Sequence, residues 1–223
     1  MAFSLKVTQL SLRKGYNLLI HNLNFDLKAG QALSLTGENG VGKTSLLRVL
    51  AGQTTPESGD IVFAHNNAPM ESETWRARHV HLLGHHDALS PARTVAQELA
   101  FQAGFFGGDI ARITPLNLQP LLDLETRYLS AGQKRRLSCA RLLIAPRPLW
   151  LLDEPMAPLD NDHRALLARL MQDHLTTGGM IIAAVHDALP FTTQSLHLTR
   201  PSFPSPLVRG EGGESASQVR GSF

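Results

Sequence analysis

Residues 32–50 read ALSLTGENGVGKTSLLRVL, and this stretch decides the fold. It begins with a short apolar run typical of a strand and ends with a helix-like pattern. The loop between them has the spacing G-x-x-x-x-G-K-S/T, which a chain of this length contains by chance on the order of one time in a hundred. The residues at its fixed positions are Gly37, Gly42, Lys43 and Thr44. A strand, a glycine-rich loop and a helix in this order predict a phosphate-binding loop.

The chemistry of such a loop explains its composition. Glycine allows the backbone to wrap closely around a phosphate, so that successive N–H groups point inward. The N-terminus of the following helix adds the positive end of its dipole. We expect Lys43 to reach the β- and γ-phosphates and the Thr44 hydroxyl to bind Mg²⁺. The expected nucleotide-binding residues are Gly37, Glu38, Asn39, Gly40, Val41, Gly42, Lys43, Thr44 and Ser45. The alternative is a glycine-rich turn without a ligand.

A second part of the site is predicted at PLWLLDEP (148–155), an apolar strand that ends in two carboxylates. Asp153 stands at the C-terminal end of the strand, where a Mg²⁺ ligand is needed beside the phosphate loop. Glu154 can face the γ-phosphate and orient or deprotonate a water molecule. An Asp-Glu pair after an apolar strand is a weak signal alone. Together with the loop it predicts a P-loop NTPase whose nucleophile is water.

The remaining chain fits an α/β fold. Early runs alternate between apolar and polar residues, as in half-exposed antiparallel strands, whereas later runs are continuously apolar, as in parallel strands covered on both faces. The expected strands are 4–10, 23–27, 32–36, 59–64, 79–83, 148–152 and 180–185, and the expected helices lie near 43–51, 94–104, 131–145 and 161–177. This order predicts a P-loop NTPase (RecA-like) lobe with an N-terminal antiparallel β element and a small helical lobe.

Composition narrows the classes of protein. The 223 residues are 43% hydrophobic and carry a net charge of +2, which gives little reason to expect nucleic acid as the main partner. The single cysteine, Cys139, excludes an intramolecular disulfide and lies in a helical pattern typical of a packed thiol. No apolar run approaches the ~20 residues that span a bilayer. Pro, Gly and Ser dominate residues 199–223, which predicts a disordered tail.

The octet LSAGQKRR (129–136) precedes a helix-like run, and Ser130 alone would be interpreted as a helix N-cap. However, a phosphate loop, then Ser-x-Gly-Gln, then an Asp-Glu strand end resembles the ATP-binding-cassette (ABC) ATPase family. The signature loop of that family reads Leu-Ser-Gly-Gly-Gln, and this chain has Ala131 in place of one glycine. The resemblance implies that a second copy of the chain is a partner and that two chains close over two ATP molecules. The loop residues that would face the partner's γ-phosphate are Ser130, Ala131, Gly132 and Gln133.

Further positions follow from the resemblance, which covers residues 1–198. APLD (157–160) resembles the loop that places an aspartate, here Asp160, at the dimer seam. His186 stands where the family has a histidine that contacts the γ-phosphate. Tyr16 would stack on adenine, although an ordinary surface tyrosine fits its spacing almost as well. The family's two lobes would comprise residues 1–86 with 139–198 (catalytic) and 87–138 (helical).

The chain departs from the family pattern at His86, which falls where a glutamine usually follows the strand that leads into the helical lobe. A neutral imidazole could still contact Mg²⁺ or the water, but it titrates near neutral pH. The surrounding histidines suggest an alternative metal or haem site, although no cysteine or carboxylate completes the spacing. They are His79, His81, His85 and His86.

Within the family, LSAGQKRRLSCARLLIAPRPLWLLDEP (129–155) is most similar to ATPase subunits of the haem exporter of bacterial cytochrome c maturation. That resemblance implies a peripheral subunit on the cytoplasmic face of the inner membrane, paired with an integral-membrane permease. ATP hydrolysis would drive haem export or release of a haem chaperone's cargo. The alternatives are a soluble cassette ATPase acting in metal-cluster assembly or on ribosomes, and a small-molecule kinase.

Overall fold

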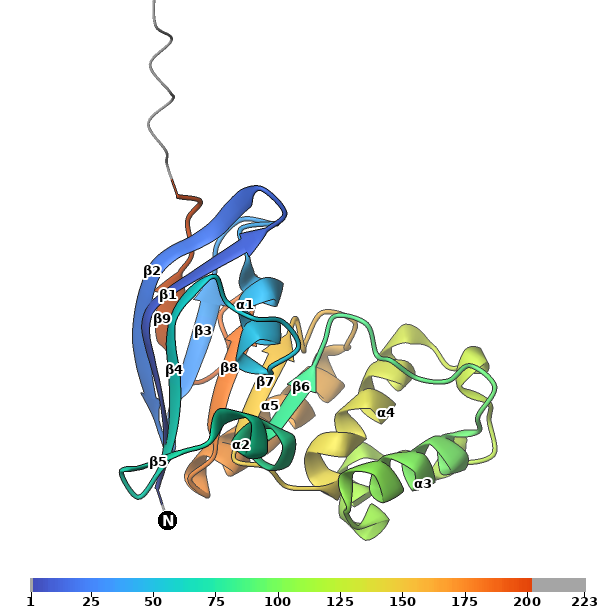
Figure 1. Cartoon of the computed structure of the whole chain (residues 1–223). Helices are drawn as coiled ribbons and strands as arrows, with labels where there is room; N and C mark the ends of the chain where they lie inside the picture. The colour runs from blue at the N-terminus through green and yellow to red at the C-terminus, as the bar shows by residue number, and fades with distance from the viewer. Residues whose placement is uncertain (1, 202–223) are drawn as a thin grey trace, which may run out of the picture.

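The computed structural model describes residues 2–201, and two sheets form its frame (Figure 1). The antiparallel sheet has the strand order β2-β1-β4-β5, and the parallel sheet has the order β6-β7-β8-β3-β9. The bounds of the antiparallel strands are β1 (Phe3–Lys14), β2 (Asn17–Lys28), β4 (Ser58–His65) and β5 (Ala68–Met70). Those of the parallel strands are β3 (Ala32–Thr36), β6 (Val80–Leu83), β7 (Leu149–Asp153), β8 (Met180–Ala184) and β9 (Gln194–His197). Apart from residues 199–201, the predicted tail lies outside the described residues.

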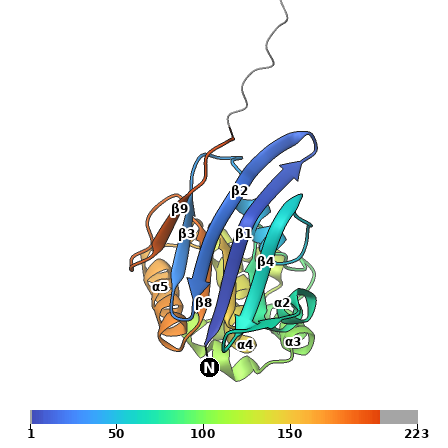
Figure 2. The same cartoon turned by 60° about the vertical axis from the view of Figure 1, so that its left-hand side comes forward.

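Within residues 2–201, five α-helices and three short 3₁₀ segments accompany the sheets. The α-helices are α1 (Lys43–Leu50), α2 (Ser72–His79), α3 (Val95–Phe106), α4 (Ala131–Ile144) and α5 (Asn161–Thr176). The 3₁₀ segments are η1 (Ile110–Leu116), η2 (Gln119–Leu121) and η3 (Thr126–Tyr128). Helix α1 lies between the two sheets, whereas α3 and α4 lie on the side of the parallel sheet away from the antiparallel one (Figure 1). Helix α5 contacts β8, and Figure 2 shows the antiparallel sheet in front of the parallel one.

The core consists of two clusters of buried side chains that share the parallel sheet. One fills the space between the antiparallel sheet, α1 and one face of the parallel sheet. The other joins the opposite face of the parallel sheet to α3, α4 and α5. Every residue of β7 and β8 is buried, as expected for central strands covered on both faces. Consequently the C-terminal ends of these strands hold their residues rigidly at one edge of the sheet.

Each expected strand and helix is present, and besides the 3₁₀ segments three further elements, α2, β5 and β9, are not among those predicted. Helix α2 buries only Trp75 and is otherwise polar, so its sequence has no apolar periodicity. Because α2 continues to His79, the strand expected at 79–83 begins one residue later. The other two elements, β5 and β9, are short strands at the edges of their sheets. Helix α4 runs unbroken through the lobe boundary expected after residue 138.

Candidate nucleotide site

The predicted phosphate loop connects β3 to α1 and has an unusual backbone. Gly37, Gly40 and Gly42 all have positive φ angles, of 127°, 79° and 120°, which residues with a side chain rarely adopt. At Gly37 a β-carbon would also collide with the carbonyl oxygen of Leu198. Glycine is therefore required at this position for two separate reasons, the backbone conformation and the close approach of the neighbouring chain.

Lys43 begins α1 and points back into the loop. Its Nζ atom donates hydrogen bonds to the carbonyl oxygens of Gly37 (2.6 Å) and Glu38 (3.2 Å), and the residue is buried. The positive charge is thus held inside the curve of the loop, beside the N-terminus of α1. Both features attract a phosphate group.

Thr44 and Asp153, which are distant in sequence, meet at the C-terminal edge of the parallel sheet. The Thr44 hydroxyl donates a 2.8 Å hydrogen bond to Oδ2 of Asp153, whose side chain is buried at the end of β7. The third expected Mg²⁺ ligand, His86, lines the same cavity of about 270 Å³ as these two residues. Hydroxyl and carboxylate oxygens are ligands that Mg²⁺ accepts, and the ion usually takes its remaining ligands from phosphates and water. The residues at this edge therefore fit Mg²⁺.

Glu154 occupies a strained position directly after β7. Its φ angle is 48°, and its N–H donates a 3.0 Å hydrogen bond to the carbonyl oxygen of Ala184 in β8. Its carboxylate contacts two histidines: Oε1 lies 3.0 Å from Nε2 of His186, and Oε2 lies 3.8 Å from Nδ1 of His85. The structure therefore brings together Glu154 and His186, the two residues expected at the γ-phosphate. The contact with His85 was not predicted from the sequence.

The LSAGQ segment forms a reciprocal cap at the start of α4. The Ser130 hydroxyl oxygen accepts a 3.2 Å hydrogen bond from the Gln133 N–H, and the Gln133 side-chain oxygen accepts a 2.8 Å hydrogen bond from the Ser130 N–H. The N-cap interpretation is thus confirmed. Capping uses a lone pair of the Ser130 oxygen and leaves its proton available for another acceptor. The cap is therefore compatible with a contact between Ser130 and phosphate.

The start of α4 also lies close to the segment that contains Asp160. A β-carbon on Gly132 would approach the Pro158 carbonyl oxygen to 3.2 Å. Asp160 caps α5, and its Oδ1 accepts hydrogen bonds from the backbone N–H (2.9 Å) and the Nδ1 atom (2.6 Å) of His163. The bond from the His163 N–H is the largest influence holding the Asp160 pKa below its usual value. The Asp160 side chain is two-thirds exposed.

The four histidines considered as an alternative metal or haem site do not converge. His79 stacks on Trp75, with ring centroids 5.2 Å apart. His81 is buried, and its Nε2 atom lies 2.6 Å from the Ala145 carbonyl oxygen. His85 and His86 lie next to each other and both line the cavity that Thr44 and Asp153 also line. Within residues 2–201 there is no group of three or more His, Cys, Asp or Glu residues arranged to hold a metal ion. The structure does not support this alternative.

Tyr16 lies in the turn between β1 and β2, and its side chain is fully exposed. Leu19 and Ile20, a few residues further along β2, lie against the position that a Gly42 β-carbon would occupy. The start of β2 therefore packs on the phosphate loop, and Tyr16 stands at the adjacent turn. Its exposure is compatible with stacking on a base and equally with an ordinary surface position.

Arg135, which the sequence did not single out, is the most highly connected side chain near the site. It is buried in α4 and donates to the carbonyl oxygens of Asp153 (2.8 Å), Glu154 (3.1 Å) and Pro155 (3.2 Å). It also donates to the carbonyl oxygen of Gly84 (2.8 Å) and the carboxylate of Asp87 (3.2 Å). The sequence signal that could have revealed Arg135 is its position on α4, on the helix face that also carries the buried apolar residues.

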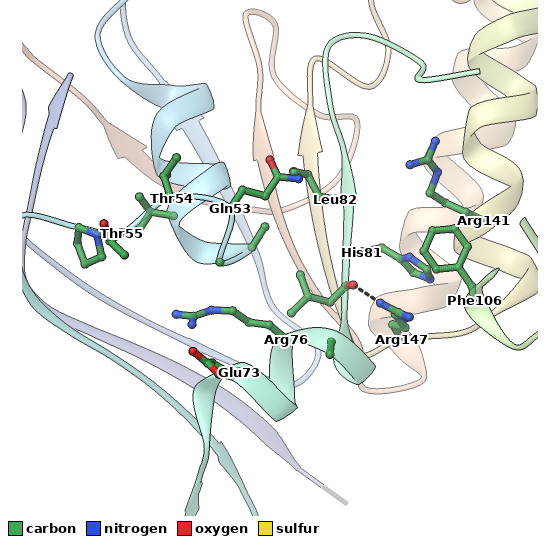
Figure 3. A pocket seen from close by; sticks show the side chains of 16 residues that line it. Gln53, Thr54, Thr55, Glu73, Arg76, His81, Leu82, Phe106, Arg141 and Arg147 are labelled. Carbon is green, nitrogen blue, oxygen red and sulfur yellow. Dashed lines mark hydrogen bonds between the residues drawn. The ribbon is translucent and has the colours of Figure 1, made fainter. Parts of the chain in front are cut away.

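A second cavity, of about 590 Å³, was also not predicted (Figure 3). Arg76, Arg141 and Arg147 line it, and none of them forms an ion pair with a carboxylate within the described part of the chain. Burial lowers the pKa of all three, but guanidinium groups stay charged at neutral pH. The cavity shares Arg141, Gln53 and Leu82 with the smaller cavity lined by Thr44, His86 and Asp153, so the two adjoin.

Comparison with known proteins gives consistent results. The family model described as ABC transporter matches residues 20–157. The "Cytochrome c biogenesis ATP-binding export protein CcmA" of Rhodopseudomonas palustris (strain HaA2) is 46% identical over 189 residues, which cover 83% of this chain and 92% of that protein. The protein of the same name from Bradyrhizobium diazoefficiens is 42% identical, with the same coverage.

Solved structures extend the comparison to the fold. An ABC transporter ATP-binding protein from Pyrococcus furiosus superposes with a TM-score of 0.74 at 21% identity, covering 87% of this chain and 97% of that chain. A dimeric bacterial ABC transporter cassette gives a TM-score of 0.74 at 19% identity, covering 87% and 94%. The predicted α/β P-loop NTPase fold is confirmed.

Proposed function

Because the chain belongs to the family of ABC transporter ATPases, we propose that it powers an exporter of cytochrome c biogenesis and that haem or a haem chaperone's cargo is what is moved. The chain is an ATPase of this family and binds ATP. The observation that carries the proposal is the 46% identity with a cytochrome c biogenesis export protein across 92% of that protein's length. The hydrogen bond between Thr44 and Asp153 supports the ATPase chemistry.

In the proposed ATP site, different side chains bind the phosphates, hold Mg²⁺ and activate the water. Lys43 and the backbone N–H groups of residues 37–45 hold the β- and γ-phosphates, because a buried cation and a helix N-terminus both favour anions. Thr44, Asp153 and His86 would hold Mg²⁺, which when bound neutralises charge on the phosphates. Glu154 orients or deprotonates the attacking water, and His186, which is 3.0 Å from the Glu154 carboxylate, contacts the γ-phosphate.

The second anion site is proposed to act on ATP held by another copy of the chain. Ser130, Ala131, Gly132 and Gln133 stand at the start of α4, and the N–H groups of Ser130 and Gln133 are used in the reciprocal cap. The N–H groups of Ala131 and Gly132 and the Ser130 hydroxyl proton are therefore the donors suited to bind phosphate oxygens. Asp160, exposed at the start of α5, would lie at the seam between the two copies. The same resemblance supports a catalytic lobe of residues 1–86 and 139–198 and a helical lobe of residues 87–138, both of which stay predictions.

An integral-membrane permease is the second proposed partner, with the chain on the cytoplasmic face of the inner membrane. Nowhere in residues 2–201 is there a helix with the length and apolarity to cross a bilayer. The arginine-lined cavity is the surface that we assign to the permease. Three arginines line this cavity beside a single carboxylate, Glu73, and none of the three forms an ion pair within residues 2–201, so the cavity fits an acidic segment. Arg141 connects this cavity to the one beside His86.

Covalent attachment of haem to c-type cytochromes tests the proposal. In a host that lacks its own copy of this subunit, the parent gene should restore c-type cytochromes, detected by the peroxidase activity of haem on denaturing gels. Lys43→Ala should not restore them, because it removes the charge at the phosphates. Normal cytochromes c without the gene, or membrane fractionation unaffected by a co-expressed permease, would favour the alternative ATPase that acts without a permease.

A further inference from the structure

The side chain of Arg135 makes contacts that no part of the proposed ATP mechanism has used. A guanidinium group has five N–H donors in a fixed plane. Arg135 makes five hydrogen bonds, to four backbone carbonyl oxygens and one carboxylate, at distances from 2.8 to 3.2 Å. Its side chain is only 2% exposed. Such complete pairing fixes the guanidinium group, and the chain segments that accept from it, in one arrangement.

The acceptors are the segments that carry the proposed catalytic groups. Three of the carbonyl oxygens belong to consecutive residues, Asp153, Glu154 and Pro155, at the exit of β7. The fourth belongs to Gly84, at the exit of β6, directly before His85 and His86. One side chain from α4 therefore ties together the two loops that surround the expected γ-phosphate position.

The backbone conformation of Glu154 is strained and has to be held by its neighbours. Its φ angle of 48° is uncommon for a residue with a side chain, and it precedes a proline, which further restricts its backbone. A strained conformation persists only where its surroundings fix it. The Glu154 N–H is fixed by the Ala184 carbonyl oxygen at 3.0 Å, and the Glu154 carbonyl oxygen is fixed by Arg135 at 3.1 Å. Both backbone polar groups of Glu154 are thus held by hydrogen bonds, the N–H group by β8 and the carbonyl oxygen by α4.

We propose that Arg135 is a positioning residue that directs the Glu154 carboxylate toward the attacking water by holding the Glu154 backbone in its left-handed conformation. The inference rests on the proposed role of Glu154. Ser130 is the N-cap of α4, so the same contact joins the helix of the second anion site to Glu154 within one chain.

The variant Arg135→Lys keeps the positive charge but replaces the planar guanidinium group with an ammonium group. The ammonium group is a compact charge and cannot reach all five acceptors. We expect kcat for ATP hydrolysis to fall by about tenfold to a hundredfold, since small misplacements of a catalytic group have effects of that size. Binding of a non-hydrolysable ATP analogue should stay within about threefold, because the phosphate loop is untouched. Turnover is expressed per analogue-binding site, so that loss of folded protein does not count as loss of kcat.

Arg136→Lys is the matched control. Arg136 lies next to Arg135 on α4 but donates to the carbonyl oxygens of Leu116 (3.1 Å) and Asn117 (3.3 Å), away from β7. If arginines merely anchored α4, the two substitutions would have equal effects on kcat. We expect the effect of Arg136→Lys to be much smaller, and equal effects would overturn the proposal.

A double-mutant cycle decides whether Arg135 acts through Glu154. If it does, adding Arg135→Lys to Glu154→Gln should lower single-turnover hydrolysis by less than about twofold further, because the group it positions is already lost. Independent effects that multiply would overturn the proposal. If Arg135→Lys binds no analogue, Asp87→Asn takes its place in the cycle, with the same expectation. Should Glu154→Gln itself leave hydrolysis unchanged, the proposed function of Glu154 fails instead.

Discussion

The hydroxyl of Thr44 donates a 2.8 Å hydrogen bond to the carboxylate of Asp153, across 109 residues of sequence. One residue belongs to the first turn of α1 and the other ends β7, and each is a weak indicator of function alone. Their contact places the phosphate loop and the acidic strand end in one site. It also places two oxygen ligands suited to Mg²⁺ side by side.

Thr44→Val should therefore abolish the effect of Mg²⁺ on nucleotide binding. Valine keeps the shape of threonine but has no hydroxyl oxygen to bind the ion. Titration of a non-hydrolysable ATP analogue, with and without Mg²⁺, should show tighter binding with the ion for the parent protein and for Thr44→Ser. For Thr44→Val the two titrations should agree within about threefold. An unchanged Mg²⁺ effect in Thr44→Val would remove Thr44 from the ligand set.

The stability of the fold should decrease as the pH falls below about 6.5. Burial lowers the pKa of His81 to about 3 and that of His174, which stacks on Trp150, to about 4. In the unfolded chain both titrate near 6.5, so between these values the unfolded chain binds protons that the folded chain does not. Stability is therefore fully present above pH 6.5 and is lost as the pH falls toward the folded pKa values. Each histidine should cost roughly 2 kcal/mol of unfolding free energy between pH 7.5 and pH 5.

Urea unfolding at pH 7.5 and pH 5 measures this loss. His81→Gln keeps a donor near the Ala145 carbonyl oxygen but does not titrate, so it should remove about half of the pH-dependent loss that the two histidines cause. If His81→Gln and the parent protein lose the same stability between the two pH values, burial of His81 is not the cause.

Charge reversal in the arginine-lined cavity should weaken the complex with the permease. Arg147→Glu places a carboxylate among Arg76, Arg141 and Phe106 and would repel an acidic segment. Recovery of the permease with tagged protein from detergent-solubilised membranes should fall by about tenfold or more, whereas ATP-analogue binding should be retained. Arg169→Glu makes the same charge change at an exposed position of α5 and is the control. Equal recovery with Arg147→Glu and Arg169→Glu would place the permease contact elsewhere.

Mixed dimers test whether the two halves of each ATP site come from different chains. Ser130→Arg puts a bulky cation at the second anion site, whereas Lys43→Ala damages the phosphate loop. Each mutant alone should hydrolyse ATP poorly. In a mixed dimer one composite site would carry both changes and the other would carry neither, so partial hydrolysis should return on mixing. A site built within one chain would always carry one of the two changes, and mixing would then restore nothing.

The sequence predicted which residues meet at the candidate nucleotide site better than it predicted the contacts that hold them in place. The phosphate loop depends on local chemistry, because the spacing of its glycines and of the lysine at the helix start is recognisable in the sequence alone. The structure shows why glycine stands there, since these positions have positive φ angles. The buried strands β7 and β8 were equally recognisable as continuous apolar runs. Contacts that depend on packing left no such pattern. The five bonds of Arg135 and the approach of His85 to Glu154 join segments whose neighbours only the folded chain determines.

Helix α2 and the arginine-lined cavity were also not predicted, because neither produces a local pattern in the sequence. Helix α2 packs a single large side chain, Trp75, which stacks on Phe63 with ring centroids 4.1 Å apart, and one buried residue makes no periodic pattern. Arg76, Arg141 and Arg147 belong to separate segments, so no window of sequence contains all three of them. For the alternative metal or haem site the relation is reversed, since His79, His81 and the His85–His86 pair are close in sequence but lie in different parts of the fold.

Phosphate release by purified Glu154→Gln protein tests the central claim most directly. The carboxylate of Glu154, 3.0 Å from His186, is the group assigned to the attacking water, and glutamine keeps its shape but cannot take a proton. With ATP and Mg²⁺ in excess, the parent protein should release phosphate without any organic acceptor. Glu154→Gln should release it at least about a hundredfold more slowly, while it still binds ATP and accumulates as an ATP-dependent dimer. Hydrolysis by Glu154→Gln within about twofold of the parent protein would contradict the account.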